Sequence, residues 1–353
     1  MTANSISLSP RTAATAIGRN WFRILLLGTI FLFGLAPRRV AAQAMPCPGP
    51  VTTITGNVNL TGTMTPPAGW IGPCIILEND GLTVNLAGFS IDVSSLGDAG
   101  VAIDTTTTNN AAILATGGSI ITAYSTSAAL SAIESEGGTN LTITGVSILN
   151  KPGATLCTLT ARNQNWGAGI TLASLTSANI STNTIECYQT GISISNSAIP
   201  RRATGLVSGN MLQNDEYTNS SLPFALGAGL VLSNSSGWSI QNNFITYDGS
   251  LNASLGCSDL PASPTTDPTD CSPAVELLGG SSGNTISGNA VNSNFAPGIF
   301  TASTTSGNKI LNNTLFGNSI ADLWDAAPPH SNAWRGNTCT VALGNVAPQK
   351  CPH

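Results

Sequence analysis

Charged side chains are scarce in this sequence: 8% of its 353 residues are Asp, Glu, Lys or Arg, and only two are His. Nucleic-acid binding needs a basic face, whereas here 17 acidic residues outnumber 12 Lys and Arg. The composition therefore predicts no nucleic-acid partner. Transition metals need clustered His, Cys or Met ligands. Two His, four Met and no CxxC motif suggest no such cluster, so no metal site or cofactor is predicted from these residues.

Long apolar runs are also missing, apart from one near the N-terminus. Arg11, Arg19 and Arg23 precede a 13-residue apolar run, Ile24 to Ala36, and a small-x-small sequence ends at Ala44. This layout is typical of a secretory signal, and the run is short for a membrane span. We expect residues 1–44 to be removed, which leaves a secreted or periplasmic protein with no membrane span. An uncleaved N-terminal anchor is the alternative.

Removing that segment leaves seven Lys and Arg against seventeen Asp and Glu, a net charge near −10. All eight Cys residues remain, and an even number in an exported chain predicts disulfides. Pairing by proximity in sequence gives 47–74, 157–187, 257–271 and 339–351, although the connectivity stays open. The residues are Cys47, Cys74, Cys157, Cys187, Cys257, Cys271, Cys339 and Cys351.

What the chain does have is a six-residue repeat, apolar-x-(Gly/Asn)-x-x-apolar. Nine segments fit it, with one Thr at the third position, and they begin at Leu86, Ala115, Ile143, Ile180, Val207, Ile240, Ile286, Ile310 and Trp334. The third residues are Gly88, Gly117, Gly145, Thr182, Gly209, Asn242, Gly288, Asn312 and Gly336. In the last six segments the fourth residue is Asn: Asn183, Asn210, Asn243, Asn289, Asn313 and Asn337.

The spacing of this repeat predicts a corner. Side chains on one face of a strand recur every two residues, so Ile180 and Ile185 can both face inward only if the chain turns between them. Gly and Asn adopt the left-handed backbone that such a turn requires. The Asn at the fourth position then faces inward, where stacked copies can hydrogen-bond one another as a ladder.

A short alternating strand precedes most corners by ten to fifteen residues. These strands are 100–103, 131–133, 169–172, 191–194, 229–232, 274–277 and 298–300. One coil takes about two dozen residues, and stacked coils build parallel sheets. We therefore predict an all-β parallel β-helix of nine to eleven coils with an inward Asn ladder. Disorder and a β-sandwich are the alternatives for this composition, but neither requires a Gly or Asn at a fixed offset.

The predicted organisation is a signal peptide (1–44), an N-terminal cap and first coil (45–80), the β-helix (81–325) with long loops between 150 and 273, and a C-terminal cap or tail (326–353). Trp324 and Trp334 are expected to cover the open last coil. His330, in a Pro-Pro-His sequence, is expected on the surface.

Four stretches carry a family resemblance: ITGNVNLT (54–61), GLTVNLAGFSI (81–91), ADLWD (321–325) and NAWRGNTC (332–339). With them, the chain resembles right-handed parallel β-helix proteins of the pectin-lyase-like superfamily, in the branch with NosD-like and carbohydrate-binding or sugar-hydrolase repeats. The resemblance covers roughly residues 47–351. It implies a right-handed β-helix and three possible chemistries: a lyase or epimerase reaction on uronic acids, a Ca²⁺-assisted version of it, and glycoside hydrolysis.

Polar and aromatic residues concentrate in the loops of consecutive coils between 150 and 260. Because loops from neighbouring coils stack, these residues are predicted to line one groove that binds a glycan through ring stacking and charge-assisted hydrogen bonds. The alternative is a set of solvated loop ion pairs. The candidates are Arg162, Trp166, Glu186, Tyr188, Arg201, Arg202, Asp215, Glu216, Tyr217, Tyr247 and Asp248.

A catalytic role needs more than a groove. A lyase or epimerase could use Arg201 or Arg202 with Tyr188 or Tyr217, and only this reading would call for Ca²⁺. Hydrolysis needs two neighbouring acids, but the residues expected to point outward show no acidic column: Glu134, Thr171, Ser193, Val231, Glu276 and Phe300. We therefore expect a non-catalytic protein that binds a polysaccharide or other extracellular polymer. The alternatives are a lyase or epimerase acting on an acidic polysaccharide and a purely structural surface protein. The oligomeric state is left open.

Overall fold

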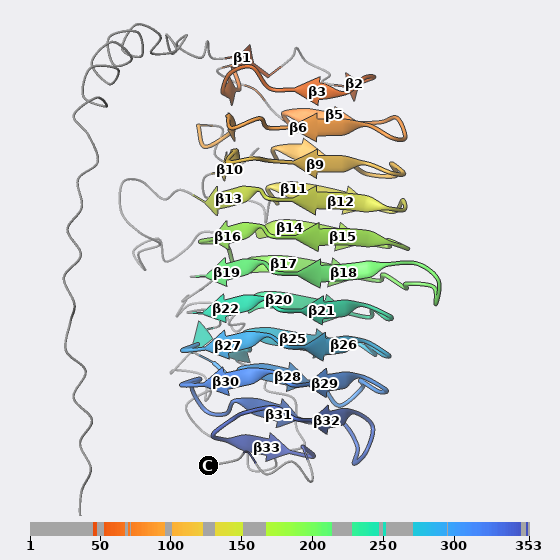
Figure 1. The fold of residues 1–353 in the computed structure, drawn as a ribbon, viewed down its shortest axis with the longest axis vertical. Coiled ribbons are helices and arrows are strands. Elements are labelled where there is room, and N and C mark those ends of the chain that lie inside the picture. Colours follow the sequence, from red (N-terminus) through yellow and green to blue (C-terminus); the bar gives the residue numbers. More distant parts are fainter. Residues whose placement is uncertain are drawn as a thin grey trace, which may run out of the picture. The chain divides into compact units, whose positions relative to one another are not determined.

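The computed structural model describes residues 45–47, 53–67, 70, 72–95, 101–122, 131–150, 167–213, 228–246, 250–251, 271–294, 296–346 and 351. The predicted signal peptide, residues 1–44, lies outside these ranges, as do most of the loops between 150 and 273. Within Gln43–His353, which is one compact unit, short parallel strands stack into three long sheets (Figure 1). In the described part of the chain, no helix is long and apolar enough to cross a membrane.

The sheets are named here A, B and C. Sheet A contains β1 (Met45–Pro46), β4 (Met64–Thr65), β7 (Ser90–Asp92), β10 (Ser119–Thr122), β13 (Ser147–Asn150), β16 (Thr184–Glu186), β19 (Met211–Gln213), β22 (Phe244–Thr246), β27 (Ala290–Asn292) and β30 (Thr314–Phe316). Sheet B contains β2 (Thr53–Ile54), β5 (Ile75–Leu77), β8 (Ile103–Asp104), β11 (Ile133–Glu136), β14 (Ala168–Ala173), β17 (Thr190–Ser195), β20 (Ala228–Ser233), β25 (Val275–Leu278), β28 (Ile299–Thr301), β31 (Leu323–Asp325) and β33 (Ala342–Gly344).

Sheet C contains β3 (Val58–Asn59), β6 (Thr83–Asn85), β9 (Ala112–Leu114), β12 (Leu141–Thr144), β15 (Ala178–Ser181), β18 (Gly205–Ser208), β21 (Ser239–Gln241), β26 (Thr285–Ser287), β29 (Lys309–Leu311) and β32 (Ala333–Arg335). A separate antiparallel pair joins β23 (Ser250–Leu251) to β24 (Cys271–Ser272). From β1 to β32 the coils contribute one strand to sheet A, one to B and one to C, in that order, and β33 of sheet B then follows β32. This arrangement, with sheets of 10, 11 and 10 strands, confirms the predicted right-handed parallel β-helix and its coil number.

The core is a stack of aliphatic columns inside the solenoid. In sheet C, Ile143 pairs with Ile113 and with Ile180, and all three side chains are fully buried. The matching column in sheet A runs through Ile148 and Ile185. Burying one such side chain stabilises the fold by about 1.5–3 kcal/mol. Because successive residues point to opposite faces, the inward Ile143 is flanked by Thr142 and Thr144, which point outward and are partly exposed.

The predicted corners are confirmed. All nine third-position residues have positive φ, including the non-glycines Thr182 (55°), Asn242 (55°) and Asn312 (54°). One detail differs: Ile143 pairs with Ile113 and Ile113 with Val84, rather than with Ala115 and Leu86. The corner is therefore two residues longer in the first two repeats than in those that follow.

Gly and Asn alternate at this corner for a steric reason. A Cβ on Gly288, whose φ is +66°, would lie 2.7 Å from Oδ1 of Asn242 in the preceding coil. The glycine thus leaves room for the amide of the Asn beside it, while Asn itself tolerates the left-handed backbone.

The predicted Asn ladder is confirmed from Asn183 to Asn337. In its middle, Oδ1 of Asn243 accepts hydrogen bonds from N and Nδ2 of Asn210, each at 2.9 Å. Nδ2 of Asn243 donates to O of Val207 at 3.0 Å and to Oδ1 of Asn289 at 2.9 Å. The same pattern links Asn183 to Asn210, Asn289 to Asn313 and Asn313 to Asn337.

A second, shorter ladder was not predicted. Asn284, Asn308 and Asn332 stack at the corner between sheets B and C, where Nδ2 of each of the first two donates to Oδ1 of the next at 3.0 Å. These residues recur every 24 positions, so the signal was present in the sequence. It covers only the last coils, where no loop interrupts the period.

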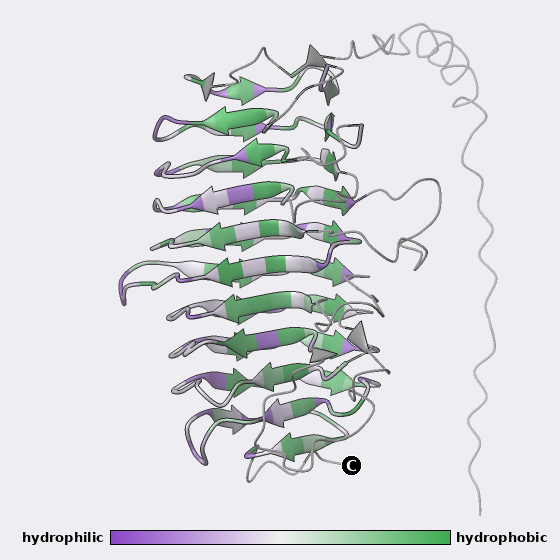
Figure 2. Cartoon of the chain, turned by 180° about the vertical axis from the view of Figure 1, so that it is seen from behind, coloured by the Kyte–Doolittle hydropathy of each residue, from purple (hydrophilic) through white to green (hydrophobic). Residues whose placement is uncertain are grey.

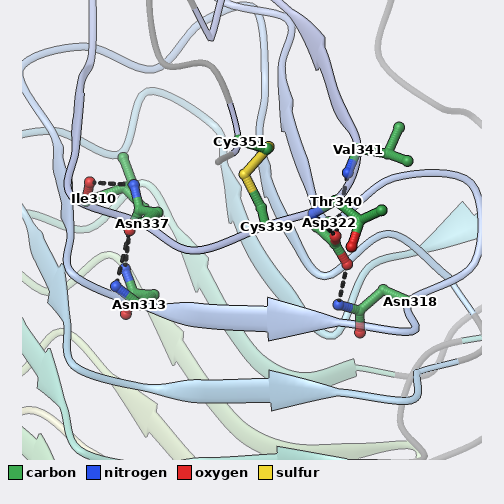
Figure 3. Close-up of a disulfide and its surroundings, with 9 residues drawn as sticks. All are labelled: Ile310, Asn313, Asn318, Asp322, Asn337, Cys339, Thr340, Val341 and Cys351. Carbon is green, nitrogen blue, oxygen red and sulfur yellow. Dashed lines mark hydrogen bonds between the residues drawn. A yellow bond between two sulfur atoms is a disulfide. The ribbon is translucent and has the colours of Figure 1, made fainter. Parts of the chain in front are cut away.

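Two disulfides close the ends of the solenoid. Cys47 is bonded to Cys74 and Cys339 to Cys351 (Figure 3), as predicted. Cys187 is also disulfide-bonded, but its predicted partner Cys157 lies outside the described residues. Cys257 lies outside them as well, and the side chain of Cys271 is not described, so the 257–271 pair stays a prediction.

The last coil is held by buried carboxylates. Oδ2 of Asp322 accepts from N of Thr340 at 2.6 Å, and its Oδ1 accepts from Nδ2 of Asn318 at 2.8 Å (Figure 3). Trp334 ends the inward column of sheet C, as expected for a cap residue. Trp324 differs from the prediction: it lies on the outer face of sheet B, where it packs edge-on against Phe300 with ring centroids 5.8 Å apart.

Candidate functional site

Most of the predicted groove residues lie outside the described part of the chain. These are Arg162, Trp166, Asp215, Glu216, Tyr217, Tyr247 and Asp248. In the sequence these residues fall between β13 and β14, between β19 and β20, and between β22 and β23. The groove and its residues stay a prediction.

Tyr188 was predicted to line this groove, but its side chain is fully buried. Its hydroxyl lies 2.8 Å from Oγ1 of Thr122 inside the solenoid. A buried phenol cannot contact a polymer on the surface, so this placement argues against a catalytic role. Glu186 does point outward from β16, where it accepts a hydrogen bond from Nε2 of Gln213.

Arg201 and Arg202 are exposed in the turn after β17, at the corner between sheets B and C (Figure 1). Tyr188 precedes β17, so the strand separates it from the two arginines. Six residues of strand span about 20 Å. The pairing of Arg201 or Arg202 with Tyr188, required by one version of the predicted lyase, is therefore not formed.

The structure instead brings two carboxylates together on the outer face of sheet B. Asp104 on β8 pairs directly with Glu134 on β11. Both side chains are partly exposed, and neighbouring strands lie about 4.8 Å apart. Oδ1 of Asp104 accepts from N of Thr106 at 2.8 Å, which orients this carboxylate. No acidic column was expected on this face from the sequence, and this acidic pair was not foreseen.

The surroundings of Glu134 favour its protonated form. Burial raises the pKa of Glu134 above its ordinary value, and the charge of nearby Asp104 raises it further. Hydrogen bonds from the backbone and side chain of Ser131 oppose this shift without cancelling it. Glu134 therefore holds a proton to higher pH than an isolated glutamic acid.

Hydroxyl groups continue the column beyond the acids. Glu134 pairs with Thr171, and Thr171 with Ser193. Oγ1 of Thr171 lies 2.6 Å from Oγ of Ser131. From Asp104 to Ser193 the column crosses four coils, about 14 Å at the usual strand spacing. Figure 2 shows this face from outside, with hydrophilic bands on β11 among apolar residues.

An apolar cluster ends this polar face toward the C-terminus. Phe300, Ala302, Trp324 and Ala326 are buried together on the same outer face, with Leu278 packed against them. Before that cluster, the polar column itself runs from β8 to β17, where Ser193 pairs with Val231 of β20. It forms the candidate functional site, named here the sheet B face: Asp104, Glu134, Thr171 and Ser193.

Asp104 was not predicted as an outward residue of sheet B because the strand was expected to end at Ile103, one residue too early. Both acids directly follow an inward Ile, Ile103 and Ile133, and these two Ile residues pair. Aligning the strands on these inward residues, and extending each by one position, would have revealed the acidic pair. The signal was present but weak, because the sequence separation between coils varies with loop length.

The stability of the protein should depend on pH through Glu134. A raised folded-state pKa means that the folded state binds this proton more tightly than the unfolded chain, so stability is lost as pH rises through that pKa. Glu134→Gln should raise the melting temperature at pH 7, and the gain should vanish near pH 3. Because the group is partly exposed, we expect under about 1 kcal/mol. Thermal unfolding from pH 3 to 7 tests this, with Glu136→Gln, on the same strand, as control. An equal gain at every pH would contradict it.

Three parallel sheets wound in one direction define the class: a right-handed parallel β-helix. The chain belongs to the NosD family, whose sequence profile, described as "Periplasmic copper-binding protein (NosD)", matches residues 102–345. A comparison with curated protein sequences gave no match.

Solved structures with similar folds include three at low identity. One is a mutant of the periplasmic alginate epimerase AlgG (TM-score 0.45, 13% identity, 80% of this chain and 67% of that chain). Another is the A-module of the mannuronan C-5 epimerase AlgE6 of Azotobacter vinelandii (TM-score 0.43, 13% identity, 78% and 74%). The third is tailspike protein 3 of bacteriophage CBA120 (TM-score 0.31, 9% identity, 85% and 50%). Similarity at this level bears on the fold alone.

The family description raises the question of a copper site. In the described part of the chain, no three His, Cys, Asp or Glu side chains gather in a metal-binding group. Its one His is His330, and five of its cysteines, among them Cys47 and Cys339, are held in disulfides. Copper prefers imidazole, thiolate and thioether ligands. The described residues therefore do not fit a copper site.

Proposed function

We propose that the protein is exported and binds a neutral polysaccharide on the sheet B face. The observation that carries the proposal is the in-register pair Asp104–Glu134, continued by hydroxyls across four coils. Carboxylates accept charge-assisted hydrogen bonds from sugar hydroxyls, and Ser and Thr can both donate and accept. Repetition of polar groups at the strand spacing suits a ligand that is itself an extended polymer.

Charge favours a neutral over an acidic ligand at this face. Two adjacent acids would repel a polyuronide, and no described Lys or Arg lies in the column from Asp104 to Ser193. An acidic polysaccharide, the substrate of the predicted lyase or epimerase, is therefore disfavoured at this place. Export is supported by the signal-like sequence at residues 1–44 and by the disulfides, which are typical of proteins that fold outside the cytosol.

The raised pKa of Glu134, beside a second carboxylate, favours a second candidate function, hydrolysis of a glycosidic bond. A glycosidase needs one protonated acid and one ionised carboxylate. Glu134, with its raised pKa, would protonate the leaving oxygen, and Asp104 would act as nucleophile or base. The strand spacing of about 4.8 Å is close to the 5–5.5 Å between carboxyl groups in retaining enzymes.

Binding can be measured by retardation of the mature protein in gels that contain neutral glycans or polyuronides. Asp104→Asn and Glu134→Gln should each weaken binding to a neutral glycan by about tenfold or more, the effect of losing one hydrogen bond to a charged group. Asp92→Asn, an acid on sheet A, is the matched control and should bind as the parent does.

Release of reducing ends from the retarding glycan then separates binding from hydrolysis. Hydrolysis predicts products that Glu134→Gln abolishes, whereas binding alone predicts none. New absorbance from unsaturated ends on polyuronides, with or without Ca²⁺, would instead support a lyase. If no glycan retards the protein, the proposal is wrong and a purely structural role is favoured.

A further inference from the structure

A hollow lies on the outer face of sheet C near the C-terminal end of the solenoid. Its volume is about 550 Å³, within the range of small-molecule sites. Strands β29 and β32 form its floor, and His330, from the segment between β31 and β32, contributes to its wall. The lining residues are Lys309, Leu311, His330, Asn332, Ala333, Trp334 and Arg335.

The strand register explains the shape of this hollow. Lys309 pairs with Ala333 and Leu311 with Arg335, so the four outward side chains form a square. The two cations occupy opposite corners, with Cα atoms roughly 8 Å apart by strand geometry. Ala333 has the smallest side chain of the four, which leaves depth between Lys309 and Arg335, and Leu311 supplies an apolar wall.

The charge of the hollow is unusual for this protein. Beyond the predicted signal peptide, acidic residues outnumber Lys and Arg by seventeen to seven. The described residues include only four Lys and Arg, and two of them, Lys309 and Arg335, line this one hollow. Within the described part of the chain, neither cation has a carboxylate partner. Two unpaired cations that share a hollow on an acidic surface attract an anion.

We propose that this hollow binds a saccharide carrying an oxyanion, either the carboxylate of a uronic acid or a phosphate ester. The guanidinium group of Arg335 can donate two parallel hydrogen bonds to either a carboxylate or a phosphate. Lys309 adds a second positive charge from the opposite corner. The sugar ring fits over Ala333 and against Leu311. This site belongs to sheet C and is independent of the sheet B face, which is acidic and suits a neutral ligand.

Calorimetric titration of the mature protein tests the proposal with trigalacturonate, glucose 6-phosphate and neutral maltotriose as probes. At least one anionic probe should bind, and which of the two binds identifies the source of the oxyanion. Maltotriose should not bind at this hollow. Lys309→Ala and Arg335→Ala should each weaken binding about tenfold or more. Arg335→Lys keeps the positive charge but lacks the bidentate guanidinium group. It should therefore lower the affinity for the anionic probe by less than Arg335→Ala does.

Two further variants separate a built site from general attraction to positive charge. Arg201→Ala with Arg202→Ala removes two exposed cations elsewhere and should leave the affinity within about twofold. Ala333→Leu fills the hollow without a change of charge and should abolish binding while the melting temperature is unchanged. The proposal is overturned if neither anionic probe binds, if the Arg201/Arg202 variant loses as much affinity as Arg335→Ala, or if Ala333→Leu binds normally.

Discussion

Replacing Asn243 with alanine is expected to lower the free energy of unfolding by about 3–6 kcal/mol. Its side chain makes four ladder hydrogen bonds in the buried interior, two to Asn210, one to Val207 and one to Asn289. Alanine leaves the N and Nδ2 donors of Asn210 without this acceptor, and an unsatisfied buried donor costs about 1–3 kcal/mol. Loss of the bond to O of Val207 adds to the penalty.

The isosteric Asn243→Asp variant shows whether the donors of the ladder matter. Its second oxygen would face O of Val207 and Oδ1 of Asn289, both of which are acceptors. We therefore expect Asp to destabilise as strongly as Ala, although it keeps the volume of the side chain. Chemical denaturation measures both variants. Hydrogen exchange should show the loss of protection beginning in β18, β21 and β26, because each coil is stabilised by its neighbours.

Gln241→Ala is the matched control for the ladder. This residue ends β21, two positions before Asn243, but it points outward and is partly exposed. Surface substitutions of this kind usually change stability by no more than about 0.5 kcal/mol. If Asn243→Ala costs no more than this control, the ladder is a consequence of the fold and contributes little to its stability.

The second large effect is expected at Asp325, where Ala should cost about 3–5 kcal/mol. This carboxylate is fully buried in the last coils. Its Oδ1 accepts from Oγ1 of Thr301 at 2.6 Å and from N of Ala327 at 3.1 Å, and its Oδ2 accepts from Nε1 of Trp334 at 2.8 Å. A buried charge is tolerated only when hydrogen bonds compensate for lost hydration, and its removal leaves those donors unpaired.

Asp325→Asn should cost less than Asp325→Ala because it can keep the acceptor at Oδ1. The amide nitrogen that replaces Oδ2 is a donor and would face the indole N–H of Trp334, which is also a donor. Part of the stability is therefore still lost. Thermal and denaturant unfolding rank the variants, and hydrogen exchange in β32, the strand that carries Trp334, reports on the cap itself. Glu78→Ala, an exposed acid near the other end, controls for the change of net charge. Equal stability of Asp325→Ala and this control would show that the carboxylate does not hold the cap.

Individual residues explain why the fold was predictable. The five-residue spacing of Ile180 and Ile185 is compatible with burial of both only if a corner lies between them, and Thr182 adopts the required positive φ. Asn243 could be assigned to the interior because a polar residue at the same place in stacked coils can bond to its own copies. These constraints are local, and they recur in successive coils. Each coil therefore predicts the same backbone geometry independently of the others.

The candidate sites were harder to predict because they depend on which coils are neighbours in space. Asp104 meets Glu134, and Lys309 lies diagonal to Arg335, through pairings between strands. In sheet B, loops of unequal length conceal that register. Tyr188 was predicted to lie in the groove because an aromatic ring with a hydroxyl group suits sugar binding. In the structure its side chain points inward, and its hydroxyl lies within hydrogen-bond distance of Thr122.

The sequence alone determined the parallel β-helix, its corners and the main Asn ladder, because a repeated spacing permits few ways to bury its apolar residues. Only the tertiary structure decided which outward residues share a face. An outward position is not constrained by the core, and its neighbours come from other coils at sequence distances set by the loops. The acidic pair on sheet B and the cationic hollow on sheet C therefore became visible only once the coils were stacked.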